Sequence, residues 1–155
     1  MHTCKRHNGN KIFNKGRIMN AAFKEALKIF DFQCAVFHDV DLIPEDDRNM
    51  YTCPQQPRHL SVAIDEMNYK LGYDLLVGGV LNMRVEHYKT VNGYSNMYVG
   101  WGAEDDDMAY RIVNQQVNKQ ALWCGNTNSP GRGFLSLTRI MSKISLIPAL
   151  TRLSH

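Results

Sequence analysis

The chain has 155 residues, enough to bury one hydrophobic core, and its hydrophobic and charged fractions of 44% and 21% are ordinary for a soluble globular protein. The formal charge of +3 is unevenly spread, because residues 31–120 carry fourteen Asp and Glu against seven Lys and Arg, whereas residues 121–155 carry no acid. This acidic middle argues against a nucleic-acid groove and favours metal ions or neutral ligands, and no stretch approaches the roughly 20 apolar residues of a membrane span.

The first predicted element is an amphipathic helix over residues 14–30, where apolar residues recur at helical spacing and Lys and Glu occupy the other face. A short apolar run over residues 34–37 then predicts a buried strand, and Asp39 and Asp41 follow it directly. Acids at the carboxyl end of a buried strand are typical of a ligand site in an α/β protein.

Two further strands are predicted over residues 59–64 and 75–83. The paired glycines Gly78-Gly79 in the second indicate a bulge or a close approach of the backbone to a ligand. Short helices are expected over residues 86–91 and 105–116, the latter with acids in its first turn.

The four cysteines leave two interpretations open. Cys34 and Cys53 flank an acidic loop, and a disulfide between them would indicate an oxidising compartment, but two buried free thiols fit the spacing equally well. A zinc site is disfavoured because the chain has no CxxC pair, and the pairing of Cys4 and Cys124 stays open.

Two acidic motifs are candidates for chemistry. Asp39-Val-Asp41 places two carboxylates where they can reach a divalent cation and the diphosphate that it carries, although a solvated turn is the alternative. Glu104–Asp107 either begins a helix, where the dipole favours acids, or supplies a general base and hydrogen-bond acceptors for hydroxyl groups. Trp101 just before this run would then offer an aromatic face to a sugar ring.

These motifs occur in one order along the chain: Phe13-Asn-Lys15, Phe37-His-Asp-Val-Asp-Leu-Ile-Pro44, Pro57-Arg-His59, Val77-Gly-Gly-Val80, Asn92-Gly93 and Trp101-Gly-Ala-Glu-Asp-Asp-Asp107. Over about residues 7–113, this order and spacing closely resemble the β1,4-galactosyltransferase family. The resemblance implies an α/β fold of the GT-A type, a Rossmann-like mixed sheet that would be incomplete at both ends here. It also implies Mn²⁺ as cofactor, a UDP-sugar donor, inversion at the anomeric carbon, and a type II membrane protein of the Golgi lumen.

The resemblance assigns a role to each matching position. Asp41 would be the Mn²⁺ ligand, and Asp105 would be the base that takes the proton from O4 of a GlcNAc-terminated glycan acceptor. Cys34 and Cys53 match the disulfide pair of the family. The acceptor would be held by Tyr73, Glu104 and Asp106. The donor nucleotide and sugar would be held by Phe13, Lys15 (usually Arg in the family), Asp39, Val40, Leu76, Gly79 and Trp101.

Leu76 bears on the choice of donor. The family members that use UDP-galactose have Tyr at this position, two residues before the paired glycines, and the smaller Leu76 leaves room for an N-acetyl group. We therefore expect UDP-GalNAc as donor, with UDP-galactose as the alternative.

Several family features are missing from the sequence: the upstream Pro-Phe-Arg motif, the membrane anchor or any signal, and the Met-x-x-His motif that supplies further metal ligands. We therefore expect residues 1–116 to be a partial catalytic domain and residues 117–155 to be a divergent basic tail. Within the tail, residues 134–147 have a loosely helical pattern, which predicts a helix packed on the core or lying on a membrane surface. A truncated, inactive relative that binds a sugar or a partner without turnover is the alternative to an active enzyme.

Overall fold

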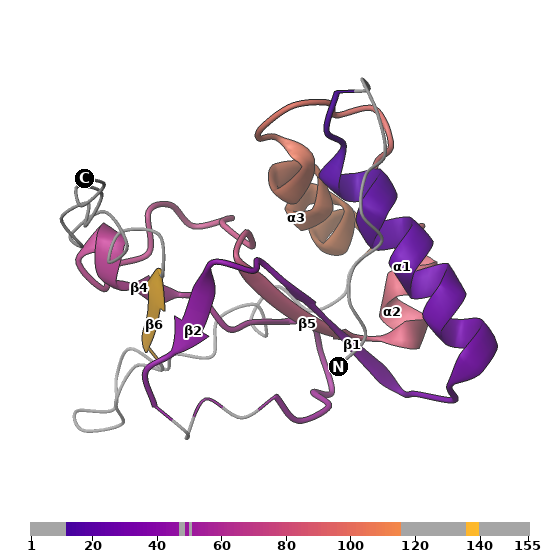
Figure 1. Cartoon of the computed structure of the whole chain (residues 1–155), viewed down its shortest axis with the longest axis horizontal. Coiled ribbons are helices and arrows are strands. Elements are labelled where there is room, and N and C mark those ends of the chain that lie inside the picture. Colours follow the sequence, from indigo (N-terminus) through magenta and orange to yellow (C-terminus); the bar gives the residue numbers. More distant parts are fainter. Residues whose placement is uncertain (1–11, 47–48, 50, 116–135, 140–155) are drawn as a thin grey trace, which may run out of the picture.

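The computed structural model describes residues 12–46, 49, 51–115 and 136–139 (Figure 1). Within these residues the strands form two three-stranded sheets, ordered β1-β5-β3 and β2-β6-β4. The strands are β1 (Cys34–His38), β2 (Leu42–Pro44), β3 (Arg58–His59), β4 (Ala63–Ile64), β5 (Val80–Arg84) and β6 (Ser136–Arg139). Every pairing is antiparallel except that of β4 with β6, so the second sheet is mixed. The α/β class predicted from the sequence is confirmed.

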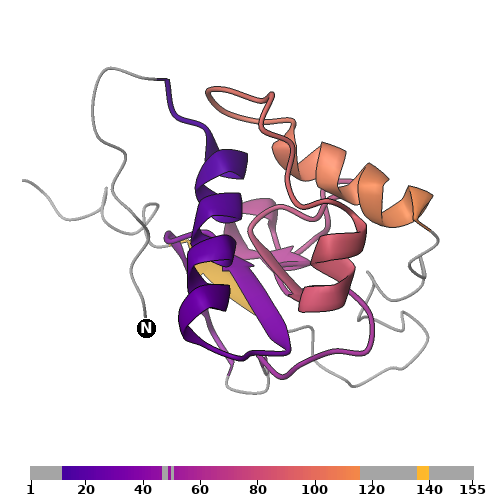
Figure 2. The same cartoon turned by 90° about the vertical axis from the view of Figure 1, so that its right-hand side faces the viewer.

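Helix α1 (Lys15–Ile29) confirms the first predicted element to within one residue at each end. It begins where the Asn14 side chain accepts a hydrogen bond from the backbone N–H of Arg17 at 2.8 Å, satisfying a donor that the first turn leaves open. The side chain of Phe23 lies on its buried face. Figure 2 shows α1 alongside the strands, next to the other two helices.

An aromatic cluster joins α1, β1 and α2 (Val85–Thr90) in the hydrophobic core. The ring centroid of Tyr88 lies 4.2 Å from that of Phe23 and 4.7 Å from that of Phe37, and the ring of Tyr94 packs edge-on against Phe37 at 5.5 Å. Such pairs contribute about 0.5–1.5 kcal/mol each beyond the area that they bury. The cluster therefore holds the middle of α1 against the end of β1.

The two strands predicted over residues 59–64 and 75–83 are longer than the strands in the structure. The first is divided into β3 and β4, and the second begins only at Val80, with the short 3₁₀ helix η1 (Asp65–Met67) between them. Gly79 has φ +90°, which is incompatible with a strand, so the carbonyls of the paired glycines bond to side chains and loop backbone instead of a strand partner. The paired glycines therefore form a turn before β5, and the predicted bulge or close approach of the backbone to a ligand stays a prediction.

Helices α2 and α3 (Glu104–Asn114) confirm the two short helices predicted from the sequence. The helix predicted over residues 134–147 is wrong at residues 136–139, which form β6 and pair with β2 and β4. The rest of that range lies outside the described residues. No helix in the described part of the chain is long and apolar enough to cross a membrane.

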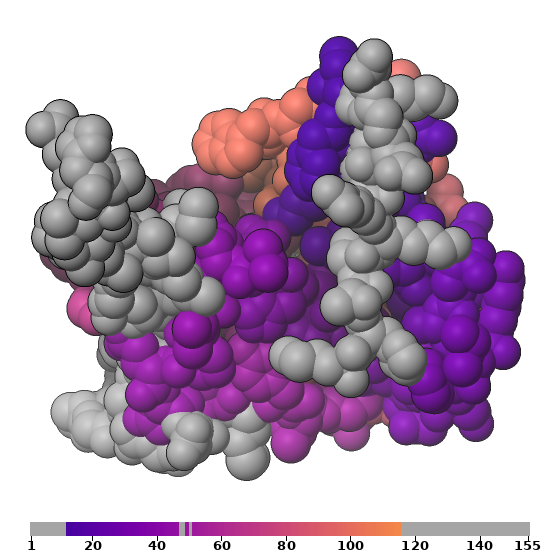
Figure 3. All heavy atoms as spheres, in the orientation of Figure 1, coloured from indigo at the N-terminus to yellow at the C-terminus, as the bar shows by residue number. Residues whose placement is uncertain are grey.

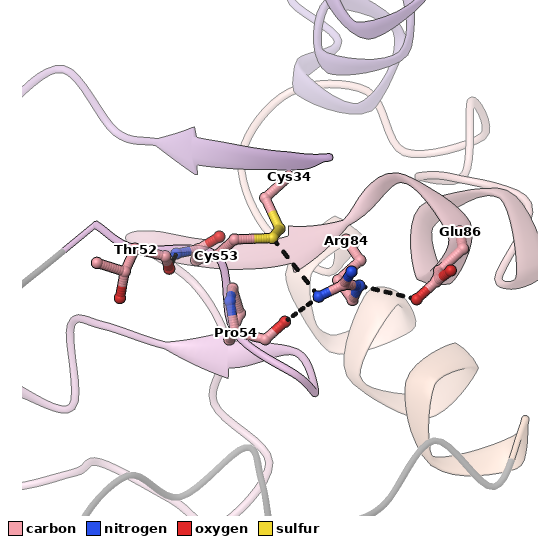
Figure 4. Close-up of a disulfide and its surroundings, with 7 residues drawn as sticks. Cys34, Thr52, Cys53, Pro54, Arg84 and Glu86 are labelled. Atoms are coloured by element: carbon pink, nitrogen blue, oxygen red, sulfur yellow. Dashed lines mark hydrogen bonds and ion pairs between the residues drawn. A yellow bond between two sulfur atoms is a disulfide. The ribbon is translucent and has the colours of Figure 1, made fainter. Parts of the chain in front are cut away.

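The Cys34–Cys53 disulfide is present, with 5.5 Å between the two Cα atoms, whereas Cys4 and Cys124 lie outside the described residues. Figure 4 shows the Arg84 guanidinium beside it, donating to the carbonyl of Pro54 at 3.4 Å and pairing with Glu86 at 2.8 Å. The disulfide and Arg84 together hold the segment that follows residue 50 against β1 and β5.

Candidate active site

Four charged residues from three elements meet at one point. Lys15 is the first residue of α1, Asp39 follows β1, and Glu104 and Asp105 begin α3. The Nζ atom of Lys15 lies 3.0 Å from Asp39 Oδ1, 2.9 Å from Asp105 Oδ2 and 3.4 Å from Glu104 Oε1. The structure therefore brings the predicted donor residue Asp39, the predicted acceptor residue Glu104 and the predicted base Asp105 together around the ammonium group of Lys15.

Burial and neighbouring charges together shift the pKa values of Lys15 and Asp105. Burial alone lowers the pKa of Lys15, but the charges of Asp105 and Asp39 outweigh it and raise that pKa well above its usual value. Burial raises the pKa of Asp105, the nearby Glu104 and Asp39 raise it further, and Lys15 offsets only part of this increase. A carboxylate with a raised pKa is the stronger base, so the environment of Asp105 suits proton abstraction.

The Gly78–Gly79 turn forms one wall of the cluster. A Cβ atom added at Gly78 would lie 2.9 Å from Asp105 Oδ2, so the lack of a side chain at this position lets the carboxylate lie close to the backbone. The carbonyl of Gly79 accepts a hydrogen bond from the backbone N–H of Asp39 at 2.8 Å. The side chains of Lys15, Asp39 and Asp105 and the backbone of Gly79 line the same small hollow.

Behind this turn lie two buried polar residues to which motif and spacing assigned no role. His59 and Ser61 are 2% and 1% exposed, and both contact the carbonyl of Gly78 at 2.8 Å. Nothing in the sequence pattern distinguishes a buried histidine in a strand from an exposed one, so this contact was found only in the structure.

On the proposed acceptor side, Tyr73 and Asp106 meet. The Tyr73 hydroxyl donates to Asp106 Oδ1 at 2.5 Å, and this hydrogen bond, burial and the charges of Asp106 and Asp105 raise the pKa of Tyr73 to about 12. The phenol is thus held as a neutral donor. The structure brings these two predicted acceptor residues together.

Trp101 is fully exposed on the loop before α3. It lies between Gly100 and Gly102, with φ +88° and +95°, and a Cβ atom at either glycine would have no neighbour within 4 Å. The segment before α3 is tied to the start of α1 by a hydrogen bond from the N–H of Gly100 to the carbonyl of Phe13 at 2.7 Å and by one from Asn14 Nδ2 to the carbonyl of Asn96 at 2.9 Å. The side chain of Trp101 itself is exposed to solvent.

The remaining predicted residues are Val40, Leu76 and Asp41. Val40 is 93% exposed in the turn after Asp39, and Leu76 lies half-buried before the paired glycines. Asp41 is also half-buried in that turn, and its carboxylate oxygens are of the kind that Mn²⁺ prefers. Within the described residues, however, no group of three or more His, Cys, Asp and Glu side chains is arranged to hold a metal ion.

Two family models match this chain. The model for the N-terminal region of glycosyl transferase group 7 matches residues 5–54, and the model for the N-terminal domain of galactosyltransferase matches residues 58–130. Among individual proteins, beta-1,4-galactosyltransferase 1 of Mus musculus is 48% identical over 110 residues, which cover 71% of this chain and 28% of that protein. Beta-1,4-galactosyltransferase 5 of Sus scrofa is 46% identical over 106 residues, covering 68% and 27%. The chain therefore spans less than a third of these relatives' length.

Solved structures lead to the same group of proteins. The catalytic domain of Drosophila beta1,4-galactosyltransferase 7 in complex with xylobiose superposes with a TM-score of 0.59 at 38% identity, covering 67% of this chain and 43% of that one. A mutant of the same enzyme, in complex with manganese, UDP-Gal and xylobiose, superposes with a TM-score of 0.65 at 27% identity, covering 93% and 58%. The fold is thus that of a GT-A catalytic domain, represented in part.

Proposed function

This chain belongs to the β1,4-galactosyltransferase family, and we propose that the protein transfers a hexose from a UDP-sugar to O4 of a terminal GlcNAc, with inversion at the anomeric carbon. The observation that carries the proposal is the position of Lys15, whose ammonium pairs with Asp39 on the donor side and with Asp105 on the acceptor side. One cation thus connects the two halves of a two-substrate site.

Asp105 is the base in this proposal. Its carboxylate takes the proton from the acceptor O4 hydroxyl as that oxygen forms a bond to the anomeric carbon and the bond to the UDP oxygen breaks. The ammonium of Lys15 keeps the Asp105 carboxylate ionised, and the raised pKa of Asp105 keeps that carboxylate basic. Glu104 and Asp106 accept hydrogen bonds from the acceptor sugar, and the Tyr73 hydroxyl fixes the orientation of the Asp106 carboxylate.

We propose Mn²⁺ as the cofactor, in keeping with the manganese and UDP-Gal in the complex of the Drosophila relative. Asp41 would hold the ion through a carboxylate oxygen, and the diphosphate of the donor would supply further oxygen ligands. The charge of the bound metal would stabilise the diphosphate as it leaves. Since the described residues contain no three-ligand cluster, Asp41 does not form a site without the donor or other parts of the protein.

For the donor we propose UDP-GalNAc, because Leu76 is smaller than the tyrosine of the UDP-galactose users and makes no hydrogen bond with its side chain. Assays of both donors against a GlcNAc acceptor test this choice, and Leu76→Tyr should shift the preference towards UDP-galactose. A preference of the unchanged protein for UDP-galactose would overturn the choice of donor but leave the transferase proposal intact.

The transferase proposal is tested by calorimetric titration of UDP-sugar into the protein with and without Mn²⁺. We expect binding that requires Mn²⁺, loss of binding in Asp41→Asn, and retained binding without turnover in Asp105→Asn. Absence of Mn²⁺-dependent binding at millimolar Mn²⁺ would rule out an active enzyme for this chain.

A relative that binds a sugar without turnover is the second candidate, favoured by the lack of a three-ligand cluster in the described ranges. It predicts saccharide binding that needs neither Mn²⁺ nor Asp41. The same titration, with a GlcNAc disaccharide in place of the nucleotide sugar, distinguishes the two candidates.

We propose that the protein works in the Golgi lumen. The Cys34–Cys53 disulfide supports an oxidising compartment, since such bonds are rare in the cytosol.

A further inference from the structure

We propose that His59 and Ser61 are positioning residues, which hold the Gly78–Gly79 turn against Asp105 and thereby set the position of the proposed base. This inference rests on the proposed function, because it gives a second group of residues a part in the same reaction. The hydrogen bonds of these two side chains join them to Gly78, to Val80 and to each other.

The first step is the hydrogen bonding of the turn. The Ser61 hydroxyl donates to the carbonyl of Gly78 at 2.8 Å and accepts from the backbone N–H of Val80 at 2.8 Å. His59 Nε2 lies 2.7 Å from Ser61 Oγ and 2.8 Å from the same carbonyl. The Ser61 hydroxyl thus bonds to both ends of the turn, and His59 lies within hydrogen-bonding distance of that hydroxyl and of the Gly78 carbonyl.

The second step is the close packing of neighbouring side chains against the turn. Gly79 has φ +90°, and a Cβ atom there would lie 2.5 Å from Ser61 Oγ and 2.9 Å from Leu42 Cδ1. The Gly79 carbonyl is held by the N–H of Asp39 on the opposite side. The turn is therefore fixed between Ser61 and the end of β1.

The third step links the turn to the base. Gly78 approaches Asp105 so closely that an added Cβ atom would lie 2.9 Å from Oδ2, the same oxygen that accepts from Lys15 Nζ at 2.9 Å. A shift of Gly78 therefore changes how Asp105 meets Lys15. Misplacement of a reacting group by about 1 Å is enough to cost on the order of a hundredfold in rate.

The chemistry of His59 suits a fixed support. Burial lowers the pKa of His59 to about 4, so the imidazole is neutral at neutral pH and does not place a charge beside the cluster. An apolar residue here would leave the Gly78 carbonyl and the Ser61 hydroxyl short of one partner in a buried setting.

The test compares Ser61→Ala with a matched control, Ser95→Ala. Ser95 is also buried, and its hydroxyl accepts from the backbone N–H of Met97, away from Gly78. We expect Ser61→Ala to move the ¹³C signal of the Asp105 carboxyl at constant pH and to lower kcat by about tenfold to a hundredfold. Ser95→Ala should change neither, even if both variants unfold at a lower temperature.

His59→Gln and His59→Leu form a second matched pair. The amide nitrogen of Gln can replace Nε2 as a donor, whereas Leu cannot donate, so the Asp105 signal and kcat should stay close to wild type in the first and change in the second. If Ser61→Ala does not fold, Ser61→Cys takes its place, because the thiol keeps the size and bonds more weakly.

An unchanged Asp105 signal in folded Ser61→Ala and His59→Leu would overturn the positioning role. The NMR measurement does not need turnover. Absence of transfer by the wild-type protein would therefore count against the proposed function, whereas the Asp105 signal decides the positioning role separately.

Discussion

Lys15 donates a hydrogen bond to Asp105 at 2.9 Å across 90 residues of sequence. The side chains are 17% and 21% exposed, so solvent screens this ion pair only in part. Because Asp39 and Glu104 also lie within 3.4 Å of the ammonium, the pair is the centre of a cluster in which acids outnumber bases.

Lys15→Met should therefore leave three neighbouring carboxylates without a counter-charge. Removing one partner of a buried ion pair costs about 3–5 kcal/mol, and partial exposure reduces this, so we expect the free energy of unfolding to fall by about 1–3 kcal/mol at pH 7. Urea unfolding measures it. Lys15→Arg keeps the charge and should lose less, and equal stability of the Met variant and wild type would contradict the prediction.

Gly78→Ala tests the contact between the turn and Asp105. The added methyl would meet the end of a flexible side chain, so we expect the Asp105 carboxylate to move while the melting temperature changes little. Activity should fall by about tenfold or more. Gly72→Ala is the control, because its Cβ would have only ordinary contacts, the nearest 3.8 Å away at Met67 Sδ, and it should keep full activity.

Tyr73→Phe removes the donor that orients Asp106. We expect the KM for the acceptor to rise several-fold while the KM for the donor is unchanged, since a single hydrogen bond to a charged group contributes about 1.5–3 kcal/mol before solvent exposure reduces it. Tyr69→Phe is a matched control, because Tyr69 is equally exposed and donates instead to Glu45 at 3.2 Å. A similar change in both variants would show that the effect is not specific to Asp106.

The helices and the first strand were predictable because each has a local cause. Asn14 caps α1, apolar residues recur along its buried face, and acids occupy the first turn of α3. The strand predicted over residues 59–64 failed because its apolar run serves two sheets, and strand pairing depends on distant partners. The same limit applies to β6, whose residues show a helical pattern but pair with β2 and β4.

The candidate site was likewise predictable from the sequence only in part. Motif order identified Asp39, Asp105 and Tyr73, but the role of Lys15 as the shared counter-ion of Asp39 and Asp105 depends on how α1, β1 and α3 meet. The support of Gly78 by His59 and Ser61 likewise arises only from the fold. The boundary between a catalytic part at residues 1–116 and a tail at residues 117–155 stays a proposal.

The Cys34–Cys53 disulfide closes a loop with a sequence separation of 19 residues. Closing a loop of about 15 residues stabilises the folded state by about 3 kcal/mol, chiefly by restricting the unfolded chain, so Cys34→Ser with Cys53→Ser should lose a similar amount. Urea unfolding of this double variant is compared with that of Cys4→Ser with Cys124→Ser. A loss of stability in the variant of Cys4 and Cys124, but not in the variant of Cys34 and Cys53, would contradict the prediction.

Acid should destabilise the protein through His59. Its pKa is about 4 in the folded state and 6.5 in the unfolded state, so below pH 6.5 the unfolded chain binds a proton that the folded protein does not. The stabilisation is complete above pH 6.5 and is lost as the pH falls towards 4, by about 3 kcal/mol in all at about 1.4 kcal/mol per pKa unit.

The raised pKa of Asp105 acts in the opposite sense, since its contribution to stability is lost as the pH rises. Comparison with His59→Gln separates the two effects, because Gln keeps the donor but does not titrate. We expect the stability difference between wild type and His59→Gln to change by about 3 kcal/mol between pH 6.5 and 4, measured by urea unfolding at each pH. His87→Gln alters a less buried histidine whose pKa burial also lowers, so it should change the curve in the same direction as His59→Gln but by less. If the stability of His59→Gln changes with pH as that of the wild type does, His59 binds its proton equally well in the folded and unfolded states. That result would contradict a pKa lowered by burial beside Ser61 and the Gly78 carbonyl.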